Sequence, residues 1–159
     1  MTGCATTRPA SPACRPLSAP QRPGPAAKAQ VMVRQILDTV YGAGPGGLPG
    51  NDDQGTMSAW CVFSARGLYP QTPGSATMLL GTPLLPDASI DRVHGRDITI
   101  GAPDADAGHP YVDAVRVDGR TGDRSWTDAS LVTRGATLAL RSAEAPNSSW
   151  GTATSRLPR

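Results

Sequence analysis

The stretch that decides the fold reads Gly47-Leu-Pro-Gly-Asn-Asp-Asp-Gln-Gly-Thr-Met-Ser-Ala-Trp-Cys-Val-Phe-Ser-Ala-Arg-Gly-Leu-Tyr-Pro70. Its first part is rich in glycine and proline, which predicts a loop, and this loop carries two adjacent carboxylates, Asp52 and Asp53. The residues that follow are apolar at nearly every position, which is typical of a helix buried between other elements. We expect this helix to run from Asp53 to Arg66, because Gly67 suits a left-handed C-cap.

Two interpretations of Asp52 and Asp53 follow from their place at the start of a helix. An aspartate there most often serves only as the N-cap of the helix. The free N–H groups and the dipole of the helix also favour the ionised carboxylate. An ionised carboxylate suits a general base or a metal ligand, and it suits a proton donor poorly. The residues alone leave both interpretations open.

A second helix is expected upstream of the loop. An apolar stripe with the spacing i, i+3, i+4, i+7 indicates an amphipathic helix, and its members are Val33, Ile36, Leu37 and Val40. We assign Arg34 and Asp38 to its solvated face. The two helices would form a hairpin within residues 30–72, with the carboxylates in the connecting loop.

Beyond residue 73 the pattern changes to short β segments separated by turn residues. We expect strands at 77–80, 89–93, 97–100, 111–117 and 136–141. Turns are predicted at His94-Gly95, Asp118-Gly119 and Arg134-Gly135. The sequence therefore predicts an α+β chain, with a helical hairpin followed by a small antiparallel β unit over residues 73–151.

Both ends of the chain differ from this ordered part. Residues 1–29 are rich in proline, alanine and arginine without apolar periodicity, and we expect them and the tail 152–159 to be disordered. With 18 glycines, 16 prolines and a single phenylalanine, the chain has little bulky material for an independent core.

Charge and cysteine content exclude several classes of function. The formal net charge is only +2, and the basic residues form no stripe along the sequence. This charge is too small to indicate a nucleic acid or an anionic membrane as partner. No apolar run approaches the length of a membrane span, and no signal peptide is evident at the start. The cysteines lack metal-ligand spacing; they are Cys4, Cys14 and Cys61.

The central stretch resembles the signature of glycoside hydrolase family 92. The shared residues are Gly-Leu-Pro-Gly-Asn-Asp-Asp-x-Gly-x-Met-Ser-Ala-Trp, followed by Phe-Ser-Ala-x-Gly-Leu-Tyr-Pro. The resemblance extends upstream through residues 36–50 and to Trp150-Gly151, so it covers roughly residues 30–151. Members of the family are calcium-dependent exo-α-mannosidases that invert the anomeric centre. The resemblance implies that the hairpin is the last one of an (α/α)6 toroid and that residues 1–29 are unrelated to the family.

The resemblance also assigns roles to the two carboxylates. Inverting hydrolysis needs a general acid and a general base roughly 6.5–9.5 Å apart, so neighbouring residues can supply only one of them. Asp53 aligns with the general base of the family and Asp52 with a supporting carboxylate. The family's acid is a glutamate in an earlier part of the barrel, and the surroundings of Glu144, the single glutamate here, do not match it.

We therefore expect a C-terminal fragment of an inverting exo-α-mannosidase. The general acid, most of the pocket for the α-mannoside glycan and most calcium ligands would lie outside this chain, in a missing N-terminal part. The chain alone would be inactive. The resemblance implies a secreted or periplasmic enzyme.

Two alternatives stay open. The β unit could be a non-catalytic carbohydrate-binding or docking module with Trp126 and Trp150 as its platform, or the chain could be a non-functional truncated gene product. Asp104 and Asp106 hint at a calcium loop but lack the later glutamate of an EF-hand. His94 and His109 each stand alone in the sequence.

Overall fold

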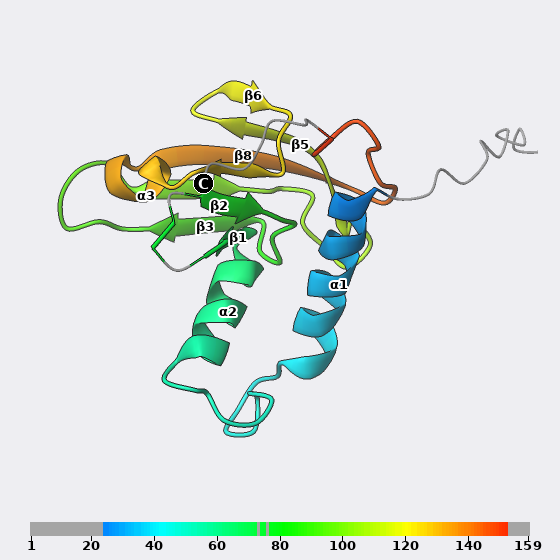
Figure 1. Ribbon diagram of the computed structural model, residues 1–159, viewed down its shortest axis with the longest axis vertical. Helices are drawn as coiled ribbons and strands as arrows, with labels where there is room; N and C mark the ends of the chain where they lie inside the picture. Colours follow the sequence, from blue (N-terminus) through cyan, green and yellow to red (C-terminus); the bar gives the residue numbers. More distant parts are fainter. Residues whose placement is uncertain (1–23, 73, 76, 153–159) are drawn as a thin grey trace, which may run out of the picture.

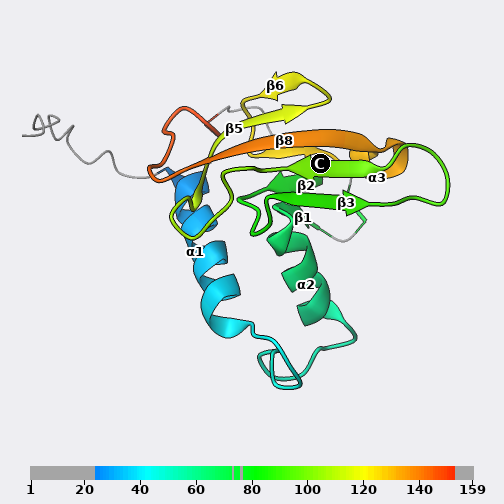
Figure 2. The same ribbon diagram turned by 180° about the vertical axis from the view of Figure 1, so that it is seen from behind.

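A computed structural model describes residues 24–72, 74–75 and 77–152 of the chain. Two helices, α1 (Pro25–Val40) and α2 (Thr56–Ala65), project side by side from one side of a β part (Figure 1). The view from behind shows the same arrangement (Figure 2). The loop that joins the two helices lies at the end of the hairpin remote from the strands. The α+β architecture predicted from the sequence is confirmed in this outline.

The β part consists of two sheets. The first is antiparallel, in the order β1-β2-β7, with β1 (Leu68–Pro70), β2 (Thr77–Leu80) and β7 (Trp126–Asp128). The second has the order β3-β4-β8-β5-β6, with β3 (Asp87–Ile90), β4 (Ile98–Gly101), β5 (Tyr111–Val117), β6 (Arg120–Gly122) and β8 (Ala136–Ala143). A short helix, α3 (Ser130–Arg134), leads into β8. All five predicted strands are present at or near their expected positions.

The prediction of a wholly antiparallel β unit is wrong. Strands β4 and β8 pair in parallel, with Ile98 opposite Ala136. The chain reaches β8 from β4 only after passing through β5, β6, β7 and α3, and a parallel pair requires a long crossover of this kind. A local sequence pattern does not reveal which distant segments pair. The sequence pattern missed four short elements: the strands β1, β6 and β7, each three residues long, and the helix α3, which has five residues.

The core lies between the two sheets and around β8. Along β8 every second residue faces this core, as in a strand with one buried face. Fully buried side chains include Leu138, Val112 and Val115. The apolar cluster continues through Leu80 of β2 and Leu131 of α3. The bulky residues of the chain are thus concentrated in the β part.

The start of α1 corrects the predicted boundary at residue 29. The helix begins at Pro25, and Ala27 is already buried. Proline is favoured at the first helical position and alanine has the highest helix propensity, so proline- and alanine-rich composition does not exclude a helix here. The remaining residues expected to be disordered, 1–23 and 153–159, lie outside the described residues, as do Cys4 and Cys14. The β unit also begins earlier than residue 73, at Leu68.

The faces of α1 differ from the predicted stripe. Leu37 is buried as expected, whereas Val40 is 45% exposed. Arg34 does not lie on a solvated face, because its side chain is only 11% exposed and pairs with Asp38 at 2.9 Å. Gln30 is 6% exposed and takes the place of an apolar residue. The reason is that α1 packs with its N-terminal half on β5 and leaves its C-terminal half beside the exposed loop.

Helix α2 corrects two further predictions. It begins at Thr56 and not at Asp53, so both carboxylates lie in the turn before it. It is also not buried on every side: Ser64 is its one buried residue, while Val62 is 49% and Phe63 36% exposed. Its main neighbours among the described elements are α1 and β1. Gly67 terminates it in a left-handed conformation with φ of +71°, as predicted.

Candidate active-site loop

Residues 41–55 form a compact loop at the tip of the hairpin. The Gly42 N–H donates to the Gly47 carbonyl at 2.9 Å, and the Gly47 N–H donates to the Gly44 carbonyl at 3.0 Å. A Cβ atom on Gly47 would lie 1.9 Å from the Gly42 oxygen, so only glycine fits there. These contacts close the loop and hold the two carboxylates at its downstream end.

Asp52 is fixed by the first turn of α2. One carboxylate oxygen accepts the Ser58 N–H at 2.7 Å and the other accepts the Ser58 hydroxyl at 2.7 Å. The Asp52 carbonyl accepts the Met57 N–H at 3.2 Å. The hydrogen bonds from Ser58 lower the pKa of Asp52, so its carboxylate is ionised near neutral pH. The N-cap residue of α2 is Gly55, which makes no side-chain hydrogen bond, so Asp52 is not the N-cap; from the preceding turn it instead accepts the free Ser58 N–H of the first helical turn.

Asp53 has a different environment. Its φ is +46°, and the next two residues are also left-handed, Gln54 with φ of +61° and Gly55 with +88°. This turn leaves Asp53 exposed. Its backbone carbonyl accepts the Thr56 hydroxyl at 2.8 Å, but its carboxylate accepts no hydrogen bond from the residues that the structure describes. Of the two neighbouring carboxylates, one is held in place and the other is free to bind a water molecule or substrate.

The left-handed turn makes a prediction about stability. A non-glycine residue in this conformation costs about 1–2 kcal/mol of folding free energy. Glycine relieves this strain but has a larger conformational entropy in the unfolded state, which opposes folding. We therefore expect Gln54→Gly to raise the free energy of unfolding by about 1 kcal/mol. The control Gln35→Gly, at an exposed position inside α1, should destabilise it by about 1 kcal/mol. Urea denaturation of both variants measures the difference. Equal destabilisation by both would show that position 54 carries no strain.

Tyr41 and Trp60 join the two sides of the loop. Their rings stack with centroids 5.5 Å apart and an angle of 17° between planes, and the Tyr41 hydroxyl donates to the Met57 carbonyl at 3.2 Å. Burial and the nearby Cys61 and Asp52 raise the pKa of Tyr41, so the phenol stays protonated and can donate. This pair fixes the end of α1 against the start of α2.

The hydrogen bonds from Ser58 to Asp52 predict that the stability of the fold decreases at acidic pH. Because folding lowers the pKa of Asp52, this group stabilises the fold above its unfolded-state pKa, and the contribution is lost as pH falls through the folded-state pKa. Ser58→Ala should raise the pKa of Asp52 towards its ordinary value and remove the part of that contribution that the Ser58 hydroxyl makes, while the backbone N–H of residue 58 still donates. An NMR titration that follows the side-chain carboxyl carbon of Asp52 measures this pKa. Ser148→Ala, at an exposed position, is the control. An unchanged pKa in Ser58→Ala would assign the shift to another group.

Glu144 does not form a catalytic pair with Asp53. It lies just after β8, with its carboxylate 82% exposed and 4.0 Å from Nε2 of His109. Asp53 lies beyond the far end of α2, a helix of 10 residues and so about 15 Å long. In Figure 1 the segment that follows β8 lies near the start of α1, whereas the loop between α1 and α2 lies at the far end of the hairpin.

The remaining sequence candidates do not assemble into a site. Asp106 binds His109 Nδ1 at 2.6 Å, and among the described residues no three histidine, cysteine or acidic side chains gather as a metal site. Trp150 is 6% exposed and belongs to the core, so the predicted platform of two tryptophans is wrong. Trp126 is half-buried, with the Arg124 guanidinium 4.9 Å from the centre of its ring.

Residues 22–143 match the glycosyl hydrolase family 92 catalytic domain. The chain belongs to this family. Because the match begins at residue 22, the expectation that everything before residue 30 is unrelated to the family is wrong.

Relatives and solved structures agree with this assignment. The chain is 31% identical over 115 residues to a protein from Arthroderma benhamiae described as an uncharacterized secreted glycosidase, covering 70% of this chain and 15% of that protein. The structure of the family GH92 α-mannosidase BT3965 from Bacteroides thetaiotaomicron superposes with a TM-score of 0.78 at 30% identity, over 84% of this chain and 18% of that chain; it is also known in complex with mannoimidazole. The structure of the family GH92 inverting mannosidase BT2199 from the same organism superposes with a TM-score of 0.76 at 31% identity. The match covers 85% of this chain and 18% of that chain. The chain thus spans less than a fifth of the length of these proteins.

None of the helices in the part of the chain that the structure describes combines the length and the hydrophobicity that a membrane-spanning helix needs.

Proposed function

We propose that this chain supplies the general-base loop of an inverting exo-α-mannosidase. The observation that carries the proposal is the contrast between the two carboxylates. Asp52 is held by Ser58, whereas Asp53 is exposed and accepts no hydrogen bond from the described residues. A general base needs an ionised carboxylate that is free to accept the proton of a water molecule. Similarity to mannosidases supports α-mannosides as the substrate.

In this mechanism Asp53 accepts a proton from the water that attacks the anomeric carbon. The attack comes from the face opposite the leaving group, which a general acid roughly 6.5–9.5 Å away protonates. Asp52 stays ionised in its bonds to Ser58, and its negative charge beside Asp53 orients the same water. Glu144, the single glutamate, lies just after β8 beside His109, so we assign the acid to polypeptide outside this chain.

The larger setting of the loop is part of the proposal. We place the hairpin at the end of an (α/α)6 toroid whose other helices bring the acid and the glycan pocket. The calcium expected for the family does not fit the described residues by themselves, since no three suitable side chains gather there; its ligands would come mainly from outside this chain. We propose a secreted enzyme, by analogy with the Arthroderma relative.

A chimera tests the function. Residues 24–152 would replace the corresponding stretch of the α-mannosidase BT3965, with which they superpose at a TM-score of 0.78. We expect the chimera to hydrolyse an aryl α-mannoside, whereas the 159-residue chain alone should show no hydrolysis because it lacks the acid. A chimera that folds but does not hydrolyse the substrate would favour the alternative that the chain is a non-functional gene product. Hydrolysis by the chain alone would overturn the assignment of the general acid to polypeptide outside the chain.

A further inference from the structure

A cleft in the β part lies away from the candidate active-site loop. Residues of β2, β5, β6 and β7 line it, and its volume is about 780 Å³, which falls within the usual range for ligand pockets. In Figures 1 and 2 the β5–β6 hairpin is at the end of the molecule opposite the loop between α1 and α2. A ligand in this β cleft would therefore be remote from Asp53.

Part of the wall of the β cleft is apolar and held by the core. Val115 of β5 and Leu80 of β2 line it, and both are buried members of the core cluster. Trp126, the first residue of β7, is half-buried and is the one aromatic side chain among the described lining residues. The pairing of Trp126 with Leu79 fixes its backbone in the first sheet. An aromatic ring held in this way offers a flat apolar surface to a ligand.

Charged side chains of both signs complete the wall. Those among the described lining residues are Asp118, Arg120, Asp123, Arg124 and Asp128. Asp118 and Asp128 already accept hydrogen bonds from backbone N–H groups of the chain. Arg120, Asp123 and Arg124 are exposed, and their side chains make no hydrogen bond to the residues that the structure describes. These three groups are available to a ligand.

Arg124 and Asp123 stand next to the tryptophan with complementary chemistry. The Arg124 guanidinium lies 4.9 Å from the centre of the Trp126 ring. A guanidinium that stacks on an aromatic ring does so with its face, so the N–H donors at its edge stay free. The ionised carboxylate of Asp123 can only accept hydrogen bonds. The β cleft thus combines an apolar ring, a fork of donors and an acceptor.

This mixture of signs selects the chemical class of the ligand. Carboxylates in the wall disfavour an anion and guanidinium groups disfavour a cation. A hydroxyl group, in contrast, can donate to a carboxylate and accept from a guanidinium. A neutral carbohydrate has such hydroxyl groups around its rim and apolar C–H groups on its faces, so it matches both parts of the wall.

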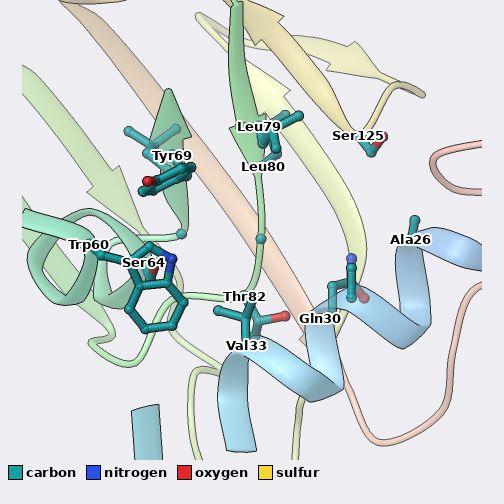
Figure 3. Close-up of a pocket in the computed structure, with 14 residues that line it drawn as sticks. Ala26, Gln30, Val33, Trp60, Ser64, Tyr69, Leu79, Leu80, Thr82 and Ser125 are labelled. Atoms are coloured by element: carbon teal, nitrogen blue, oxygen red, sulfur yellow. The ribbon is translucent and has the colours of Figure 1, made fainter. Parts of the chain in front are cut away.

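The other cavity between the helices and the first sheet lacks these features. Its volume is about 210 Å³, and no charged side chain is among its described lining residues. Val33, Trp60 and Leu80 contribute to its mainly apolar wall (Figure 3). It offers no ionised partner for the hydroxyl groups of a sugar.

We propose that the β cleft is a carbohydrate site separate from the candidate active-site loop. A pyranose ring packs against Trp126, and its hydroxyl groups bond to Asp123 and Arg124. Trp150 has no part in this site, because it is buried in the core. The site would retain a glycan on the protein at a distance from Asp53. The inference requires no hydrolysis and does not rest on the proposed function.

Amide NMR spectra of the full 159-residue chain test the site. The probe is methyl α-mannopyranoside, because solved structures similar to the chain are α-mannosidases. We expect saturable shifts of the backbone amides of residues 120–128 with a Kd in the millimolar range, as for a small polar ligand with few contacts. The absence of saturable shifts, or shifts confined to residues 41–55, would overturn the proposal.

Substitutions in the wall identify the contacts. Asp123→Asn and Arg124→Ala should each weaken binding about tenfold, the usual effect of losing a hydrogen bond to a charged group. Asp104→Asn and Arg116→Ala make the same changes at exposed residues that do not line the β cleft, and they should leave the Kd unchanged. Equal weakening by a variant and its matched control would overturn the assigned contacts.

Two further measurements test the ring and the class of ligand. Trp126→Leu keeps an apolar residue in β7 and should abolish the saturable shifts, and an unchanged Kd would overturn the packing on the ring. Methyl α-glucuronide, an anionic pyranoside, should bind at least about tenfold more weakly than the mannoside because of the nearby carboxylates. Tighter binding of the glucuronide would show an anion site and overturn the proposal. Since every readout is binding to the chain alone, a chimera without hydrolysis would remove the proposed function and leave this site standing.

Discussion

Replacing Asp53 by asparagine in the chimera is expected to lower kcat for aryl α-mannoside hydrolysis by about 10²–10⁴-fold, the usual contribution of a general base. Asparagine has the same shape but cannot accept a proton from water. The carboxylate of Asp53 is exposed and accepts no hydrogen bond from the described residues, so its loss should leave the loop intact. Steady-state kinetics measures the effect, and KM should change much less than kcat.

Two other aspartates provide the comparison for this result. Asp104→Asn makes the same chemical change at an exposed residue of the β part and should leave kcat unchanged. Asp52→Asn should lower kcat less than Asp53→Asn, and it should also loosen the start of α2, because Asp52 accepts two hydrogen bonds from Ser58. If Asp52→Asn proved the more damaging of the two, the roles of base and supporting carboxylate would have to be exchanged.

Gly135→Ala is expected to destabilise the chain by about 3 kcal/mol or more. Gly135 has φ of +76° and ψ of 153°, a conformation that essentially only glycine adopts. An added Cβ would lie 1.9 Å from the Arg96 carbonyl oxygen and 2.6 Å from its carbon, both backbone atoms that cannot move aside alone. Gly135 precedes β8 where this strand meets β4 in parallel. Strain and overpacking together therefore disrupt the centre of the larger sheet.

Urea denaturation and amide exchange measure this loss. Gly46→Ala is the control, because no atom lies within 4 Å of an added Cβ there. Stability of a domain is only about 5–15 kcal/mol, so the Gly135 variant should unfold at much lower urea, with exchange accelerated first in β4 and β8. Protection in these strands equal to that of the Gly46 variant would show that Arg96 can move away at little cost.

The sequence by itself determined the order and kind of the main elements. Strands Thr77–Leu80 and Tyr111–Val117 have the predicted bounds, because alternation and β-branched residues are local features with a period of two. The end of α2 at Gly67 was equally local, since a left-handed C-cap favours glycine. The glycine- and proline-rich composition likewise placed the two carboxylates where the loop between two helices meets the second helix, although that helix begins at Thr56 and not at Asp53.

Tertiary structure alone decided the rest. Three features depend on which distant segments of the chain contact each other: the parallel pairing of β4 with β8, the burial of Trp150 and the burial of Gln30. A local sequence pattern does not contain this information. The difference between the two carboxylates is also a matter of geometry, because the left-handed turn at residues 53–55 sends Asp52 to Ser58 and leaves Asp53 in solvent. The apolar sequence of α2 indicated a helix with neighbours on every side, yet burial depends on the elements that surround a helix. Here α1 and β1 are its main neighbours, and Val62 and Phe63 stay exposed.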